Sequence, residues 1–183
     1  MLRRYAEKIL SEWVGFFSVN ALADQTGLRD KSVDFITAAQ AAHWFDRMQF
    51  QRECRRILKH GGKTALIWNI RDNEHDMIKR DYAIREKYAM DRKGLGDAGG
   101  PWTGISDFFS NESCEVKIFR NDLVFDRENY IGRNLSASYA PRIETDPQKY
   151  HGFVCELNEL FDKYNVSGNL RFPHFTQSFA GSV

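Results

Sequence analysis

This sequence has few prolines and few cysteines, and neither positive nor negative charge is in excess. Its 183 residues include four prolines and three cysteines. Cys54, Cys114 and Cys155 stand far apart, with no C-x-x-C pair and no histidine at a finger-like spacing. This pattern predicts free thiols in a reducing compartment and no metal site. No apolar run is long enough to span a bilayer. Arg3-Arg4 lacks the apolar stretch and cleavage site of an export signal, so we expect a soluble, cytoplasmic protein.

The charge balance excludes another class of partner. The 26 basic and 25 acidic residues leave a net charge of +1. Such a chain has no global attraction to nucleic acid or to an acidic membrane. Arg52, Arg55, Arg56 and Lys59 form a basic helical stripe, but no aromatic residues are interleaved, so a solvated helix face is favoured. We therefore expect a small molecule or another protein as the partner.

What the chain does contain is enough for a packed core. Hydrophobic residues make up 42% of the sequence and aromatic residues 14%. A chain of this length buries roughly 70% of its unfolded surface on folding. We therefore expect a single domain over residues 1–183.

Apolar periodicity predicts alternating helices and strands. The expected helices cover residues 2–13, 46–58 (ended by Gly61-Gly62), 76–91, 128–138 and 150–164, and the expected strands cover residues 16–19, 33–39, 64–70, 114–125 and 170–179. The strand at 33–39 is nearly continuous in apolar residues, which suits a strand covered on both faces. Pro173 suits an edge or a bulge. The alternation predicts an α/β fold with a mostly parallel sheet flanked by helices and an antiparallel edge.

One stretch of the sequence carries a family pattern. It reads Asp24-Gln-Thr-Gly-Leu-Arg-Asp-Lys-Ser-Val-Asp-Phe-Ile-Thr-Ala-Ala-Gln-Ala-Ala-His-Trp-Phe-Asp46. Two further blocks follow in order and at the right spacing, Glu53-Cys-Arg-Arg-Ile-Leu-Lys-His-Gly-Gly62 and Ala65-Leu-Ile-Trp-Asn-Ile-Arg-Asp72. Together they resemble the class I S-adenosylmethionine-dependent methyltransferases of the type 11, ubiquinone-biosynthesis-like group.

The resemblance implies a Rossmann-like fold and also marks departures from it. In the family, a strand with a glycine-rich loop and a second strand ending in an acid come before the opening helix. Neither precedes Leu2, so we expect a truncated form of the fold. Arg29 and His60 stand at turn positions where the family usually has proline.

On the cofactor side, the resemblance assigns four residues. Ala23 and Asp24 correspond to the adenine-side turn, where Asp24 would accept a hydrogen bond from the adenine amino group. Ala39 and Gln40 end the strand whose carboxyl end faces S-adenosylmethionine, which is where open α/β sheets place ligands.

On the acceptor side, the resemblance places four more residues. His43 and Trp44 would lie beside the methyl-transfer site, where His43 would orient the substrate or act as a base. Asn69 and Arg71 leave the next strand at the same end of the sheet, and Arg71 would bind an anionic substrate.

Structural interpretations stand beside these roles. Asp24 is also readable as an ordinary loop acid and Gln40 as a helix-entry residue. For His43, packing between aromatic residues is favoured because no partner carboxylate is identifiable. For Arg71, an exposed surface arginine is favoured.

A glycine pattern elsewhere in the chain invites a different interpretation. Gly94-Leu-Gly-Asp-Ala-Gly99 matches G-x-G-x-x-G letter for letter. A dinucleotide site needs a strand before this motif and a helix after it, and here a charged helix end precedes it and Gly100-Pro101 follows. We therefore predict a loop over the substrate mouth rather than a nucleotide site.

Two functions remain open on the sequence. The first is S-adenosylmethionine-dependent methylation of a small-molecule acceptor. The second is a non-catalytic, dimerising remnant or binding module. In either case the strand at 33–39 has lost its central neighbours, so we expect the strand at 16–19 to close the gap or the chain to form a homodimer through the exposed sheet edge.

Overall fold

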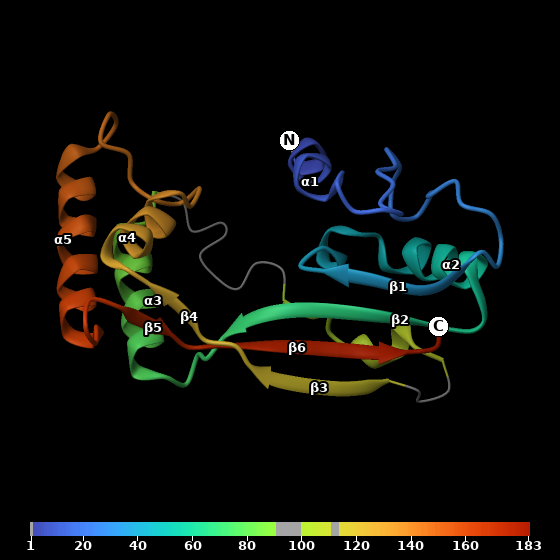
Figure 1. Ribbon diagram of the computed structural model, residues 1–183. Coiled ribbons are helices and arrows are strands. Elements are labelled where there is room, and N and C mark those ends of the chain that lie inside the picture. The colour runs from blue at the N-terminus through green and yellow to red at the C-terminus, as the bar shows by residue number, and fades with distance from the viewer. Residues whose placement is uncertain (1, 91–99, 111–113) are drawn as a thin grey trace.

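The computed structural model describes residues 2–90, 100–110 and 114–183 and has an α/β architecture (Figure 1). Along the chain the elements are α1 (Leu2–Leu10), β1 (Val33–Ala39), η1 (Ala42–Trp44), α2 (Arg47–Ile57), β2 (Leu58–Arg71), α3 (Asp76–Tyr88), η2 (Ile105–Phe108), β3 (Glu115–Arg120), β4 (Leu123–Phe125), α4 (Arg127–Leu135), α5 (Pro147–Tyr164), β5 (Leu170–Phe172) and β6 (His174–Gly181). Among the described residues, no helix has the length and apolarity needed to cross a bilayer.

The main sheet is mixed, in the order β1-β2-β6-β3. β1 runs parallel to β2, with Thr37 opposite Ala65. β6 lies antiparallel to both β2 and β3. The predicted α/β fold with an antiparallel edge is thus confirmed, but the sheet contains one parallel pair and is less parallel than expected.

Aspartate residues set the starts of three helices. Asp46 Oδ1 accepts from Gln49 N at 2.9 Å and so caps α2, as predicted. Asp126 and Asp146 cap α4 and α5 in the same way. Each cap satisfies an N–H group that has no partner within the helix and is worth about 1 kcal/mol.

Buried apolar side chains form two clusters. The first packs one face of the main sheet against α2 and η2 and includes Phe50, Leu66, Trp68, Phe108 and Phe179. The second joins α3, α4, α5 and β5 and includes Met77, Tyr130, Phe153, Leu157 and Phe172. Figure 1 shows the second group of helices beyond the carboxyl ends of β1 and β2.

Proline divides the predicted final strand into two. Pro173 cannot donate a backbone hydrogen bond, and it separates β5 from β6. β5 pairs with β4 in a small second sheet, whereas β6 crosses between β2 and β3. Pro173 was expected to mark an edge or a bulge, but it lies between two strands, and β6 is an inner strand of the main sheet. The predicted strand at 114–125 is likewise divided at Asn121-Asp122, into β3 and β4.

Three local predictions were also wrong. No strand forms at residues 16–19, so that segment does not close the gap beside β1, which is an edge strand. Met48, expected inside, is 68% exposed because the buried face of α2 follows Phe50, Glu53, Cys54 and Ile57. The helix ends at Ile57, before Gly61-Gly62.

Gly61 and Gly62 lie within β2, where they allow a turn of the backbone and a close approach to β1. Gly61 has a φ of 77°, a left-handed conformation that favours glycine. A Cβ at Gly62 would lie 3.1 Å from Asp34 O, so the glycine lets β2 approach β1 closely. The register between the two strands shifts here, since Val33 faces Leu58 and Phe35 faces Lys63.

Candidate functional site

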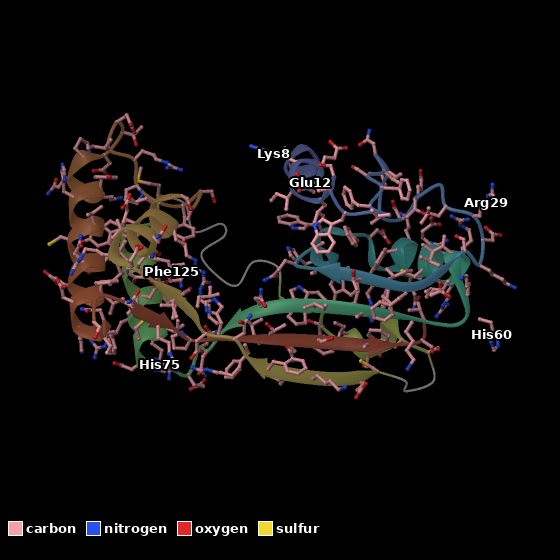
Figure 2. All side chains as sticks on the ribbon, viewed as in Figure 1. Lys8, Glu12, Arg29, His60, His75 and Phe125 are labelled. Carbon is pink, nitrogen blue, oxygen red and sulfur yellow. The ribbon has the colours of Figure 1, made fainter. Side chains whose placement is uncertain are left out.

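The candidate site lies at the carboxyl ends of β1 and β2, which point toward the second group of helices (Figure 1). Figure 2 shows Arg29 and His60 at the opposite end of the sheet, and His75 and Phe125 among the helices. The two turn departures noted in the sequence, Arg29 and His60, therefore lie far from the predicted site.

Gln40, immediately after β1, is held against β2. Its backbone N–H donates to Ile67 O at 2.9 Å, and its side-chain Nε2 donates to Asn69 O at 3.0 Å. The residue has a φ of 50°, a left-handed conformation that is unfavourable for a non-glycine residue. Strain of this kind concentrates at functional sites, and here two hydrogen bonds to β2 maintain it.

A cavity of about 370 Å³ opens beside β1. It is lined by β1, α2 and the turn before β1, through Ala23, Thr26, Ile36, Thr37, Ala38, Ala39, Ala41, Phe45, Phe50, Cys54 and Ile57. This volume is at the lower end of the range for small-molecule sites, about 300–1,000 Å³. Two of the four predicted cofactor residues, Ala23 and Ala39, therefore face one cavity, and Asp24 and Gln40 follow them directly in the chain.

A buried carboxylate holds the turn that forms one wall of this cavity. Glu53 Oε1 accepts from Thr26 N at 2.9 Å and from Thr26 Oγ1 at 2.5 Å. Arg56 Nε donates to Glu53 Oε2 at 2.9 Å, and Arg56 also donates to Leu28 O. These contacts, led by the Arg56 hydrogen bonds, lower the pKa of Glu53 to about 2. Glu53 was not among the predicted site residues; its position as an acid inside the basic helical stripe is visible in the sequence, but its contact with Thr26 is not.

Two of the four residues of the basic stripe form ion pairs with neighbouring acids. Arg56 pairs with Asp30 and Glu53, and Lys59 Nζ lies 2.9 Å from Asp34. These ion pairs agree with the interpretation of the stripe as a solvated helix face.

The cavity also contains a thiol. Burial raises the pKa of Cys54 to about 12, so the thiolate that reacts with alkylating reagents is suppressed. Cys155 is exposed and Cys114 is partly buried.

We expect the Cys155 thiol to react fast with a maleimide in the native state at pH 7.5. The Cys54 thiol should react only in denaturant. Peptide mapping by mass spectrometry after timed labelling measures this difference. Cys155→Ser should remove the fast phase. Rapid native labelling of Cys54 would contradict the buried site.

His43 and Trp44 lie on η1 near the buried Trp68. Trp68 Nε1 donates to His43 Nδ1 at 3.4 Å, and the His43 and Trp44 ring centroids are 4.9 Å apart. Because an indole N–H is only a donor, the neutral His43 ring carries its proton on Nε2. This arrangement suits a hydrogen-bond donor toward a substrate better than a base. Trp44 is 78% exposed beside it.

The segment before η2 is fixed to the start of α2. Arg47 donates to Thr103 O at 3.1 Å and to Gly104 O at 2.5 Å, and its guanidinium lies 5.7 Å from the Trp102 ring centroid. Trp102 in turn packs edge-on against Trp68, with the ring centroids 6.4 Å apart. The predicted loop at Gly94–Gly99 falls outside the described residues.

Asn69 and Arg71, at the end of β2, face different surroundings. Thr176 Oγ1 donates to Asn69 Oδ1 at 2.7 Å and accepts from Asn121 Nδ2 at 2.8 Å. Arg71 is half-buried rather than exposed. Burial lowers the pKa of Arg133, and the nearby charge of Arg71 lowers it further. Arg71 therefore belongs with the helices rather than with Gln40 and Asn69.

The protein resembles methyltransferases in sequence. Residues 1–66 match the family model described as a methyltransferase domain. A methyltransferase-like protein of Schizosaccharomyces pombe is 39% identical over 156 residues, which is 84% of this chain and 59% of that protein. A second S. pombe methyltransferase is 43% identical over 60 residues, 33% of this chain and 24% of that protein. The chain thus covers less than two thirds of the length of these relatives.

Solved structures resemble it in fold. A putative type II methyltransferase from Anaeromyxobacter dehalogenans superposes with a TM-score of 0.56 at 22% identity, covering 96% of this chain and 77% of that one. A putative methyltransferase from an antibiotic biosynthesis pathway of Anabaena variabilis gives a TM-score of 0.53 at 16% identity, covering 90% and 72%. At these identities the likeness concerns the fold.

Proposed function

Because the chain belongs to the type 11 methyltransferase family, we propose that it serves methyl transfer from S-adenosylmethionine to a small-molecule acceptor in the cytoplasm. The observation that carries this proposal is the cavity shared by Ala23 and Ala39. It lies against β1 and reaches the carboxyl end of that strand, the region in which open α/β sheets bind ligands.

The described residues fit one part of the cofactor. Ala23, Ile36 and Ala39 give the cavity apolar walls suited to adenine. Asp24 follows Ala23 in the chain and is the proposed acceptor for the amino group. Within residues 2–32 no glycine-rich loop follows a strand. The described residues therefore include no loop of this kind to contact the ribose and the sulfonium. The fit therefore covers the adenine end, and we assign no transfer step to the rest.

On the acceptor side, the residues of this chain orient rather than react. S-adenosylmethionine supplies an activated methyl group, so the protein mainly has to hold the nucleophile in line, an effect worth up to about 7–11 kcal/mol. His43 Nε2–H is a donor for an acceptor oxygen, and the exposed Trp44 ring gives it an aromatic surface. The Asn69 amide is fixed by Thr176.

A thermal melt with S-adenosylhomocysteine tests the proposal. Ligand at 100 times its dissociation constant stabilises the native state by about 2.7 kcal/mol, which raises the melting temperature by roughly 5–10 °C. We expect a shift of this size for the wild type and for Ala21→Trp, since Ala21 is exposed and does not line the cavity.

The cavity variant is Ala23→Trp, which fills the site and should abolish the shift while the protein still melts cooperatively. If the wild type shows no shift at millimolar ligand, the cofactor proposal fails, and a non-catalytic binding or dimerising module replaces it. If Ala23→Trp shifts like the wild type, the cavity is not the site.

A further inference from the structure

Arg133, on α4, lies against two aromatic rings. Its guanidinium carbon is 4.7 Å from the centroid of the Phe172 ring and 5.3 Å from that of the Phe125 ring. Figure 2 shows Phe125 among the helices. A ring face attracts a cation but does not supply the acceptor oxygens that the five N–H groups of a guanidinium can bind. Among the described residues, no hydrogen-bond acceptor and no ion-pair partner contacts Arg133.

Other arginines that lie over aromatic rings differ from Arg133 in this respect. Each of them also donates a hydrogen bond to an oxygen atom. They are Arg47 with Gly104 O, Arg85 with Asp81, Arg120 with Asp72 and Arg127 with Asn158. A partly buried donor without an acceptor is uncommon in folded proteins and calls for an explanation. A ligand that carries an acceptor group would provide one.

The carboxylate of Asp81 acts on Arg133 through its charge, but both of its oxygens bind other side chains. Asp81 Oδ2 accepts from Arg85 Nε and Oδ1 accepts from the Tyr130 hydroxyl, each at 2.8 Å. Asp81 and Arg85 are both 1% exposed and form an ion pair with each other. The charge of Arg133 is therefore not compensated by an ion pair within the part of the chain that the structure describes.

The surroundings of Arg133 disfavour its positive charge. Burial lowers the pKa of Arg133, and the charge of Arg71, at the end of β2, lowers it further. Arg127, on the same helix, shows the opposite direction, since its hydrogen bond to Asp162 raises its pKa. An anion beside Arg133 would offset both the effect of burial and the repulsion by Arg71.

Solvent reaches the Arg133 guanidinium, so a ligand can reach it as well. Arg133 is half-buried, and none of its nitrogen atoms is sealed off from solvent. Phe125 is also half-buried, so apolar surface from its ring is accessible in the same part of the molecule. The side chain of Arg133 and the ring beside it therefore combine an accessible cation with an apolar surface.

We infer that Arg133 binds the carboxylate group of a small organic molecule. The N–H groups of a guanidinium match the two oxygens of a carboxylate in a bidentate geometry. A carboxylate carries a single charge, so it loses less hydration energy on entering a partly buried site than a phosphate does. The ring surface of Phe125 suits the organic part of such a molecule. This inference does not depend on cofactor binding, since Arg133 does not line the cavity beside β1.

A titration of the wild type with phenylacetate tests the inference. The signal of the Arg133 side-chain Nε–H group is followed in proton–nitrogen correlation spectra and is identified by its absence in Arg133→Lys. We expect a saturable shift with a dissociation constant on the order of 1 mM. Phenylacetamide has nearly the same shape but no charge, so it should cause no such shift. Constant ionic strength throughout the titration removes the effects of general screening.

Two variants distinguish this site from a general attraction of anions to the protein, with backbone amide shifts as the measure of binding. Arg133→Gln should weaken phenylacetate binding at least about 10-fold, because it removes the charge and the bidentate donors. Its matched control is Arg127→Gln, which should leave the affinity unchanged, since Arg127 already binds Asn158 and Asp162. No saturable shift in the wild type, an equal response to phenylacetamide, equal losses in the two variants, or tighter binding of inorganic phosphate would each overturn the inference.

Discussion

Replacing Asp81 by asparagine is expected to lower the free energy of unfolding by about 3–5 kcal/mol. Asp81 Oδ2 accepts from Arg85 Nε at 2.8 Å, and Oδ1 accepts from the Tyr130 hydroxyl at 2.8 Å. Asp81 and Arg85 are each 1% exposed. Asparagine keeps the size of the side chain but removes the negative charge, so the buried Arg85 guanidinium loses its ion pair with Asp81.

The same helix supplies the control. Asp76 and Arg80 are also four residues apart on α3 and also 2.8 Å apart, but both are more than half exposed. Asp76 also accepts from the Tyr164 hydroxyl, a contact that the asparagine amide oxygen can keep. Asp76→Asn should therefore cost far less than Asp81→Asn. In urea unfolding the two variants should differ by several kcal/mol, with melting temperatures roughly 6–20 °C apart. Equal losses would mean that burial does not govern the Asp81–Arg85 pair.

Replacing Glu53 by glutamine is expected to cost about 2 kcal/mol at pH 7, the value of hydrogen bonds to a charged group. Glutamine still accepts from Thr26, but it loses the charge that Arg56 contacts twice. The turn at residues 23–26 and the cavity wall it forms should loosen together. Asp34→Asn is the control, since Asp34 has the same kind of partner on the exposed surface.

Acid should remove the Glu53 contribution in a defined range. Its pKa is about 2 in the folded protein and about 4.3 in an unfolded chain. The unfolded state therefore takes up the proton first as the pH falls. The stabilisation is complete above about pH 4.3 and is lost toward pH 2. Unfolding free energies of wild type and Glu53→Gln should converge over this range. A constant difference from pH 7 to pH 2 would contradict the assigned role.

Local signals in the sequence predicted the elements better than their partners. The strand at 33–39 and the Asp46 cap were confirmed to the residue, because apolar runs and capping side chains act over a few residues. Pro173 was visible, but whether it lies within a strand or between two sheets depends on partners more than 100 residues earlier, in β2. The unpaired edge of β1 was foreseen, but the alternative that residues 16–19 close it was wrong, since no other described strand pairs with β1.

The site was foreseen in a similar way. Resemblance assigned Ala23 and Ala39, which the structure brings to one cavity, and Gln40 and Asn69, which it joins by a hydrogen bond. The roles of these residues in binding stay predictions. The Glu53–Thr26 contact spans 27 residues of chain, and no local pattern indicates it. Likewise, the spacing of Asp81 and Arg85 is visible in sequence, whereas their burial arises only when α3 packs against α4 and α5.

The place of β6 in the sheet has a consequence for how the chain folds during synthesis. β6 is the latest strand in the sequence, yet it lies between β2 and β3 and pairs with both. While the ribosome is still producing the residues after α5, no strand joins β2 to β3. During the same interval, Leu66 and Trp68 lack their packing contact with Phe179. Contacts of such long separation form slowly. The nascent chain must therefore hold β2 with one edge open until residues 174–181 emerge, an interval in which chaperone binding competes directly with aggregation.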